Sequence, residues 1–176
     1  HALELVTTAT MVIGFRETIG QRLNHLERIR ALQDRSRKQG LAGFIAFISW
    51  TLQLNEKTPL ARLWGIEQHT VDAADYMRNI ALSRIFLDNI PHVKAYWIML
   101  GIPVAQMALA FGADDIDGTV TEERIYHDAG ATTPMSMPRK DLVRLLHDAG
   151  FEPVERDTLY NVIREHARSA APGGCA

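Results

Sequence analysis

VKAYWIMLGIPVAQMALAFGADDIDGTVTEE, residues 93–123, is the stretch that decides the fold of this chain. Residues 95–112 carry no charged side chain, and this run is long enough to cross a membrane on length alone. Gly101 and Pro103 interrupt the run at its middle, and its polar and aromatic side chains are spread through it rather than gathered as an interfacial belt. We therefore reject a membrane span and expect buried elements of a globular domain.

The same stretch predicts two apolar strands joined by a helix. The first strand runs from residue 93 to about Leu100, and Pro103 lies in the first turn of the helix that follows. Gly112 ends this helix as its C-cap, and residues 113–117 form the second strand. Strands that are apolar on both faces are typical of parallel strands covered by helices, so the pattern predicts a parallel α/β fold.

Polar side chains gather where the second strand ends: Asp114, Asp115, Asp117 and Thr119. In parallel α/β folds, ligands bind at the carboxyl ends of the strands, so these residues are candidates for a functional site. The alternative is helix capping, because Thr119 and Glu122 have the spacing of a capping box.

Composition limits the function of the chain. With 176 residues and 47% hydrophobic content, it can bury one sizeable core. A net charge of -2 offers no basic surface for nucleic acid, and no basic amphipathic segment indicates a membrane surface. Cys175 is the only cysteine and lies in the tail, so we expect neither disulfides nor a metal site, in a reducing, cytoplasmic setting. The chain begins at His1 without an initiator methionine, and we expect it to be the back part of a longer protein.

The rest of the chain repeats the strand-helix pattern. Short runs rich in β-branched and aromatic residues predict strands over residues 5–14 and 43–50, and amphipathic periodicity predicts helices over residues 16–38, 70–89 and 138–149. Residues 54–70 form a loop that is long enough to suggest a function.

The predicted order gives an α/β fold with about four parallel strands, flanking helices and a C-terminal helical extension. Four such units are half of a (β/α) barrel of the TIM type, which closes at eight. We expect a single domain over residues 1–168 and a disordered tail over residues 169–176. Thr8 and Thr10 share one face of the first strand, which in a barrel could be the polar lumen; otherwise they are ordinary strand formers.

Several motifs resemble one enzyme family over nearly the whole chain. The motifs are TTATMVIGFRET (7–18), HLERIRALQD (25–34), ALSRIFLDNI (81–90), AYWIMLG (95–101), FGADDIDGTVTEERIYHDAGA (111–131) and VERDTLYNV (154–162). They resemble the C-terminal half of the radical S-adenosylmethionine enzymes of the futalosine route to menaquinone. AYWIMLG and GADDIDGTVTEE are most similar to aminofutalosine synthase, whereas VIGFRET and FISWTLQ are closer to cyclic dehypoxanthine futalosine synthase.

This resemblance implies a partial barrel that holds S-adenosylmethionine and a [4Fe-4S] cluster in the complete enzyme. It implies a 5'-deoxyadenosyl radical that adds to the enol ether of a chorismate-derived carboxyvinyloxybenzoate, with loss of carbon dioxide. The cofactor supplies this chemistry, and the protein orients and shields it. The family's three cluster-binding cysteines, spaced CxxxCxxC, are absent from the chain, so cysteine ligation of the cluster is excluded here.

By position, the resemblance also assigns roles to individual residues. It implies a place near the cofactor for Thr8, Thr10, Glu17 and Gln53, a catalytic role for Asp115 and Asp117, and substrate binding by Trp97, Asp114 and Thr119. Radical addition needs no general base, so these groups would position the ligand by hydrogen bonds. For Trp97, a place in the core is the alternative. The chain departs from the family at Phe15, where a histidine is usual, and from the aminofutalosine synthase pattern at Ser49, Trp50 and Gln53.

Two classes of function remain. The first is the cofactor- and substrate-side half of a radical enzyme, inactive alone, which needs its missing N-terminal half or a second copy as its partner. The second is a small α/β domain that binds a ligand without catalysis.

Overall fold

The computed structural model describes residues 1–56, 59–65, 71–120, 123–128 and 133–167. Its strands are β1 (Thr7–Ile13), β2 (Phe44–Thr51), β3 (His92–Lys94), β4 (Val154–Arg156) and β5 (Val162–Glu165). Its helices are α1 (Ile19–Lys38), α2 (Pro59–Trp64), α3 (Ala73–Phe86), α4 (Trp97–Leu100), α5 (Ile102–Ala110), α6 (Ile125–Asp128) and α7 (Arg139–Asp148). Within the described ranges, every helix is too short or too polar to cross a bilayer.

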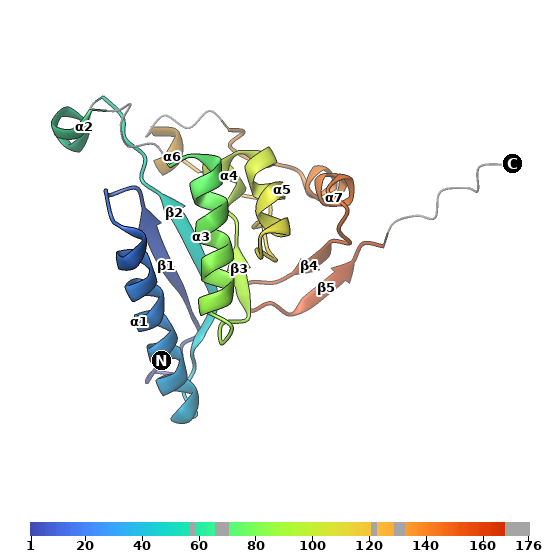
Figure 1. Cartoon of the computed structure of the whole chain (residues 1–176). Helices are drawn as coiled ribbons and strands as arrows, with labels where there is room; N and C mark the ends of the chain where they lie inside the picture. The colour runs from blue at the N-terminus through green and yellow to red at the C-terminus, as the bar shows by residue number, and fades with distance from the viewer. Residues whose placement is uncertain (57–58, 66–70, 121–122, 129–132, 168–176) are drawn as a thin grey trace, which may run out of the picture.

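The first three strands form a parallel sheet in the order β1-β2-β3, and α1, α3 and α5 lie along one face of it (Figure 1). Burial along β1 alternates with the period of a strand: Ala9, Met11 and Ile13 are buried, whereas Thr8 and Thr10 are exposed. One face of the sheet therefore carries the core, and the other is open at β1.

The helices begin where the sequence supplies caps. The Thr18 hydroxyl accepts a hydrogen bond from the backbone N–H of Gln21, and the Gln21 Oε1 accepts one from the Thr18 N–H, so that α1 starts with a complete capping box. Asp72 caps α3 through the N–H of Asp75. The sequence predicts this helix from residue 70, with Thr70 as the candidate cap, but Asp72, two residues further on, accepts the bond and the helix begins at Ala73; Thr70 itself lies outside the described residues.

The predicted strand over residues 93–100 is mostly helical. β3 ends at Lys94, Tyr96 has extended backbone angles, and residues 97–100 form α4. A short, wholly apolar run has no periodicity that separates a buried strand from a buried helix, which explains the error. Gly101, at φ 77°, separates α4 from α5, and the predicted helix after it is confirmed.

Of the predicted fourth strand, residues 113–117, the structure forms only one parallel bridge. Lys94 pairs with Asp115, and the backbone N–H of Ala95 donates to the Asp115 carbonyl at 2.7 Å. The described part of the chain thus contains a three-stranded parallel sheet and one bridge rather than four full strands, and it does not by itself close a barrel.

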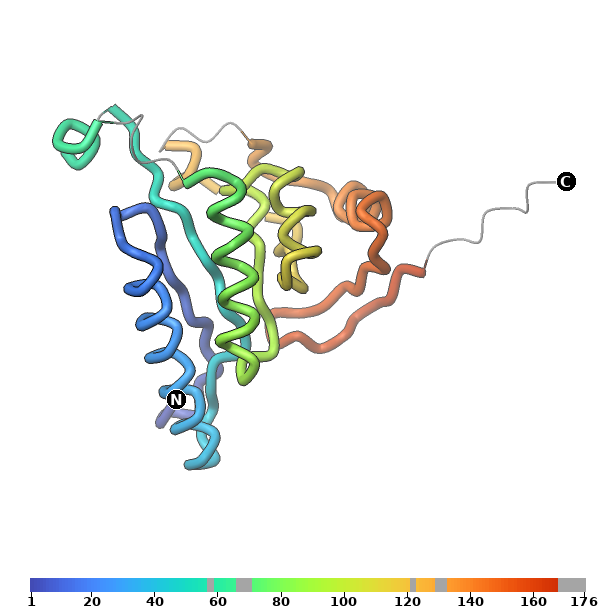
Figure 2. The backbone as a smooth tube through the Cα atoms, viewed as in Figure 1, coloured from blue at the N-terminus to red at the C-terminus, as the bar shows by residue number. Residues whose placement is uncertain are grey.

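The C-terminal extension is an antiparallel hairpin rather than the predicted helical segment. β4 and β5 pair after α7, and Figure 2 shows this hairpin beyond β3, away from β1. Val154, Val162 and Ile163 favour strands, and the Asp157 carboxylate accepts hydrogen bonds from the N–H groups of Leu159 and Asn161, which closes the turn. The predicted tail over residues 169–176 and the partner of the Thr119 capping box, Glu122, lie outside the described residues.

The predicted loop over residues 54–70 contains a helix, α2, among its described residues. Trp64 of α2 packs against the turn after β1: its ring lies 6.5 Å from the Phe15 ring, and the Arg16 guanidinium lies 4.8 Å from its centre. The loop thus returns to the carboxyl end of the first strand.

Candidate functional site

The face of the sheet turned away from α1 and α3 is the candidate site, and we call it the inner face. Residues that pair across parallel strands point to the same side, so the register extends this face from the exposed positions of β1 to the other strands. It carries Thr8, Thr10 and Val12 from β1, Ala46, Ile48 and Trp50 from β2, and His92 and Lys94 from β3.

One row of the inner face joins two groups of predicted residues. Thr10 pairs with Ile48, Ile48 with Lys94, and Lys94 with Asp115. Strands lie ~4.8 Å apart, so Thr10 and Asp115 are separated by about 14 Å across three spacings. Thr10, from the predicted cofactor side, and Asp115, from the predicted acidic side, therefore face the same space, at a distance that suits the two ends of an extended ligand.

Thr8 and Thr10 are both exposed on this face, with Thr8 one row nearer the amino ends of the strands. Their hydroxyls are accessible to a ligand, as the sequence predicts for a polar lumen. Val12, 46% exposed, continues the same face toward the carboxyl end of β1.

Glu17 lies in the turn after β1 and binds this turn itself. Its carboxylate accepts hydrogen bonds from the N–H of Gly14 at 3.0 Å, the N–H of Phe15 at 2.6 Å and Nε of Arg22 at 2.7 Å. Burial alone would raise the pKa of Glu17, but the hydrogen bonds from Gly14 and Arg22 outweigh it and lower the pKa below its usual value. A cofactor contact would have to share this carboxylate.

Gln53, the fourth predicted cofactor residue, follows β2. Its Nε2 donates to the Thr51 hydroxyl at 3.0 Å. Gln53 and Glu17 thus both lie just past the carboxyl ends of neighbouring strands, β2 and β1.

The three aspartates of residues 114–117 point in different directions. Asp114 turns toward the helices, where it accepts hydrogen bonds from Arg84 Nη2 at 2.6 Å and pairs with His92 Nδ1 at 2.7 Å. Asp115 accepts from Arg156 Nε at 2.8 Å and from the Asp117 N–H at 2.6 Å. The structure therefore gives Asp114 a role in joining α3 to β3, whereas Asp115 lies on the inner face.

Asp117 has a costly conformation. Its φ of 66° lies in the left-handed region, which a residue with a Cβ adopts at a cost of ~1–2 kcal/mol. Its carboxylate forms an ion pair with Lys94. Burial raises the pKa of Asp117 above its usual value despite this cation.

Trp97 packs in the core next to the turn that contains Asp117. The indole is 1% exposed, and its Nε1 donates to the carbonyl of Gly118 at 3.2 Å. The structure therefore places Trp97 in the core, next to the predicted acidic residues but behind them. Thr119 follows Gly118 and is exposed.

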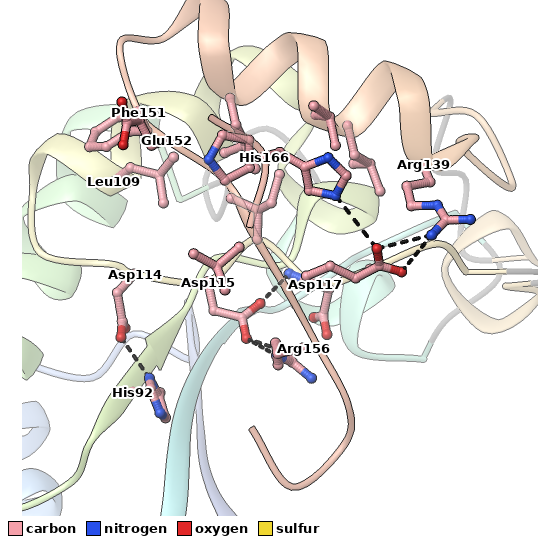
Figure 3. Close-up of a pocket in the computed structure, with 18 of the residues that line it drawn as sticks. His92, Leu109, Asp114, Asp115, Asp117, Arg139, Phe151, Glu152, Arg156 and His166 are labelled. Carbon is pink, nitrogen blue, oxygen red and sulfur yellow. Dashed lines mark hydrogen bonds and ion pairs between the residues drawn. The ribbon is translucent and has the colours of Figure 1, made fainter. Parts of the chain in front are cut away.

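A cavity of about 730 Å³ opens beside this turn (Figure 3). Asp115, Asp117 and Thr119 line one side of it, and apolar side chains of α5, α7 and the hairpin line the other, among them Leu109, Leu142, Leu146, Val154 and Val162. This volume lies within the range of small-molecule sites.

A stack of three side chains ties the hairpin to the sheet at this cavity. The Tyr160 ring lies parallel to the His92 ring, with centroids 3.8 Å apart, and the Arg156 guanidinium lies 4.1 Å from the Tyr160 ring centre on the hairpin. Arg156 also binds Asp115, so the hairpin is attached to Asp115 by charge and to β3 by the His92–Tyr160 stack. Burial, with the nearby Asp115 carboxylate, raises the pKa of Tyr160.

Three aromatic rings meet at the carboxyl edge of the inner face. Trp50 lies 5.4 Å from Tyr96 and 5.5 Å from Tyr126, measured between ring centroids, and the two tyrosines are 5.9 Å apart. The Tyr96 hydroxyl donates to Glu123 at 3.0 Å. Burial raises the pKa of both tyrosines, so their hydroxyls stay protonated near neutral pH.

Comparison with known proteins decides the family. Residues 41–169 match the family model described as the CofH/MqnC C-terminal region. The chain belongs to this family. It is 43% identical over 164 residues to aminodeoxyfutalosine synthase of Thermus thermophilus, covering 93% of the chain and 42% of that protein. It is 37% identical over 157 residues to cyclic dehypoxanthine futalosine synthase of Halalkalibacterium halodurans, covering 89% of the chain and 39% of that protein.

A third relative carries another activity in its name. The 5-amino-6-(D-ribitylamino)uracil--L-tyrosine 4-hydroxyphenyl transferase of Methanopyrus kandleri is 31% identical over 164 residues, covering 93% of the chain and 43% of that protein. The chain thus spans well under two thirds of the length of these relatives. The shared family confirms the predicted resemblance to futalosine enzymes.

The residues of this chain fit one part of the cofactor set that the resemblance implies. Thr8 and Thr10 offer accessible hydroxyls on the inner face, as a polar organic cofactor such as S-adenosylmethionine would need. The cluster does not fit: the sequence holds one cysteine, and in the described ranges no group of three His, Cys, Asp or Glu side chains could hold a metal ion. We derive no step through a cluster bound by this chain.

Sequence reasoning missed Lys94, Arg156 and Tyr160. Lys94 sits inside a stretch read for its apolar residues, and its position two residues before Tyr96 could have placed it on the inner face. Arg156 and Tyr160 reach the site only through the hairpin, which no local pattern connects to residue 115. His92 was missed for the same reason, because Tyr160 is its stacking partner.

Proposed function

We propose that this chain is the cofactor- and substrate-side part of a radical S-adenosylmethionine enzyme of menaquinone biosynthesis, similar to aminofutalosine synthase. When bound in the complete enzyme, the cofactor supplies a 5'-deoxyadenosyl radical for addition to a chorismate-derived carboxyvinyloxybenzoate. The observation that carries the proposal is the inner-face row from Thr10 to Asp115, in a chain 43% identical to an aminodeoxyfutalosine synthase.

The proposed roles of the residues follow from their places. Thr8 and Thr10 would hydrogen-bond the cofactor from β1, and Gln53 would contact it from the end of β2. Glu17 would act on the cofactor through the backbone turn that it holds, since Gly14 and Phe15 already use its carboxylate.

The acidic side of the row would bind the substrate. We propose that Asp115 and Asp117 touch the reacting molecule, with Thr119 beside them at the cavity. Asp114 and Trp97 would not touch the substrate directly. Asp114 would position His92, and Trp97 would hold the turn by its hydrogen bond to the Gly118 carbonyl.

Cyclic dehypoxanthine futalosine synthase is the second candidate. VIGFRET at residues 12–18 and FISWTLQ at residues 47–53 are closer to that enzyme, and both segments end at the carboxyl edge of the inner face. A non-catalytic ligand-binding domain is the third reading, and the cavity alone would serve it equally well.

The proposed partner is the rest of the barrel or a second copy of the chain. β1 is an edge strand, and Asp115 forms a single parallel bridge with Lys94 of β3. In the complete protein, further strands would pair with both edges and close the inner face into a lumen. Substrate and cofactor would then be shielded from water, which radical chemistry needs.

The test compares this chain with the full-length natural protein that contains it. Both are reconstituted anaerobically with iron and sulfide, reduced, and given S-adenosylmethionine and the carboxyvinyloxybenzoate. We expect 5'-deoxyadenosyl products from the full-length protein and none above a no-protein control from the 176-residue chain, which lacks the thiolates. Turnover of dehypoxanthine futalosine instead would select the second candidate.

Asp117→Ala in the full-length protein tests whether Asp117 serves substrate binding or only stabilises the fold. We expect turnover to fall at least tenfold while the melting temperature changes by a few degrees. A large loss of melting temperature with unchanged activity per folded molecule would show that Asp117 serves the fold.

A further inference from the structure

Lys94 lies at the centre of the inner face, and none of the proposed cofactor or substrate contacts uses it. It pairs with Ile48 on one side and Asp115 on the other, so it sits in the middle row. Its side chain is 13% exposed, and its ammonium is paired with the Asp117 carboxylate. An ammonium carries three N–H donors, and one carboxylate does not use them all.

Two aromatic residues lie two positions further along the chain than Lys94 and its strand partner, toward the carboxyl edge of the inner face. Tyr96 follows Lys94 by two residues, and Trp50 follows Ile48, the strand partner of Lys94, by two residues. The Trp50 and Tyr96 rings are 5.4 Å apart. Within the described residues, the buried Trp50 Nε1 has no hydrogen-bond partner, which costs ~1–3 kcal/mol.

The conformation that forms the Lys94–Asp117 pair lowers the stability of the fold. Asp117 is half-buried, with its side chain 19% exposed, and it has a left-handed backbone without being glycine. Costs of this kind persist mainly at functional sites. The geometry points to Asp117 as a stand-in for the ligand: without ligand, its carboxylate pairs with Lys94 where the ligand's carboxylate would bind.

We propose that Lys94 binds the carboxylate of a ligand whose planar aromatic ring lies against Trp50 and Tyr96, and that Asp117 releases Lys94 to this carboxylate while staying next to the ligand. This deepens the proposed function and rests on it for the choice of the inner face as the ligand side. A polar atom on the ring would satisfy the Trp50 N–H.

The charges around the pair set the pH dependence. Asp115 and Arg156 compensate each other, and the Tyr96 and Tyr160 hydroxyls are protonated near neutral pH. When Asp117 takes up a proton, Lys94 keeps an uncompensated positive charge. Because burial raises the pKa of Asp117, this happens at higher pH than for an exposed aspartate. Carboxylate binding therefore strengthens as pH falls toward the pKa of Asp117.

Benzoate is the probe, titrated by calorimetry or ligand-observed NMR into the full-length natural protein without cluster or S-adenosylmethionine. We expect millimolar binding that tightens as pH falls from 7.5 toward the pKa of Asp117, which burial raises above its usual value. Asp117→Asn removes the competing charge, so it should bind benzoate at least threefold more tightly and lose the pH dependence. Lys94→Met should weaken binding at least tenfold.

Two controls test the chemistry. Benzamide has the same ring without the charge, and it should not gain affinity in Asp117→Asn. Arg144→Gln removes a cation with a 69% exposed side chain on α7 and should leave benzoate binding unchanged.

Clear results would overturn the proposal: no benzoate binding by either the native protein or Asp117→Asn, equal binding of benzamide, or unchanged binding in Lys94→Met. If Lys94→Met fails to fold, the sign of the Asp117→Asn effect decides, because a merely structural pair predicts no tightening. The proposed function fails separately, through lack of S-adenosylmethionine cleavage by the reconstituted full-length protein, which benzoate binding does not involve.

Discussion

The Glu17 carboxylate holds the turn that connects β1 to α1, because it accepts bonds from two backbone N–H groups and from Arg22. We expect Glu17→Gln to lower the free energy of unfolding by about 1–2 kcal/mol at pH 7, since charge-assisted hydrogen bonds are lost. Urea denaturation of both proteins measures this difference.

The pH dependence of that difference follows from the lowered pKa of Glu17. A carboxyl whose pKa is lower in the folded protein stabilises it above the unfolded-state value of 4.5, and this contribution is lost as pH falls through the folded pKa. The gap between native protein and Glu17→Gln should therefore close in acid. A gap that is constant from pH 7 to pH 3 would contradict the assignment.

Single residues were predictable from the sequence where they follow a strand directly. Asp115 and Asp117 were predicted at the carboxyl edge of the sheet because parallel strands present their carboxyl ends together, and the structure brings Asp115 into one row with Thr10. The sequence could not decide whether Trp97 faces a ligand or packs in the core, because both kinds of indole have the same apolar neighbours in sequence; the structure buries it.

At the scale of elements, α5 meets α3 through a glycine. An added Cβ on Gly112 would lie 2.8 Å from the Cβ of Arg84, and the φ of Gly112 is +111°. We expect Gly112→Ala to lower stability by about 2–4 kcal/mol, from the backbone conformation and the clash together. Gly40→Ala is the matched control: φ is +65° and nothing lies within 4 Å, so only the backbone cost of ~1 kcal/mol applies. Equal losses in thermal melts would rule out the clash.

The hairpin β4–β5 depends on one stack for its attachment. Tyr160→Ala removes the ring between His92 and Arg156, worth about 1–2 kcal/mol. We expect hydrogen exchange of the β4 and β5 amides to become roughly tenfold faster, while exchange in α3 is unchanged. Leu159→Ala, in the same turn but 58% exposed, should have no such effect. Uniformly faster exchange across the chain would show that the stack belongs to the core.

Elements with a clear period were predicted well, and those without one were not. α1 ends at Lys38 as its periodicity predicts, but it begins at Ile19, because Thr18 is the cap, and the polar Gln33 and Ser36 are buried beside Leu26 where leucines were expected. α4 has no period of its own, and residues 95–100 were read as part of a strand. The hairpin is set by the Asp157 turn and by tertiary contacts to His92 and Asp115, which short-range patterns do not contain.

At the scale of the whole molecule, the described residues leave the β1 edge of the sheet without a neighbouring strand and several apolar side chains exposed. β1 is an edge strand, and exposed apolar residues lie along it and on the hairpin: Leu3, Leu5, Val6, Val12, Val154, Leu159, Val162 and Ile163. Unpaired edges and exposed apolar surface favour association with another chain.

We therefore expect the 176-residue chain either to pair with a second copy or to retain the remaining part of its protein when both are present. Closing the inner face would pair the β1 edge and cover Val12, which is 46% exposed, whereas a compact monomer leaves both in water. Light scattering at high micromolar concentration measures the mass. Val12→Lys places a charge on the face that closure would bury, and it should shift the chain toward the monomer; Leu63→Lys, on α2 and 79% exposed, is the matched control and should not. A native chain that stays monomeric without any added protein would contradict the half-barrel and favour the small ligand-binding domain, because such a domain needs no partner to cover this face.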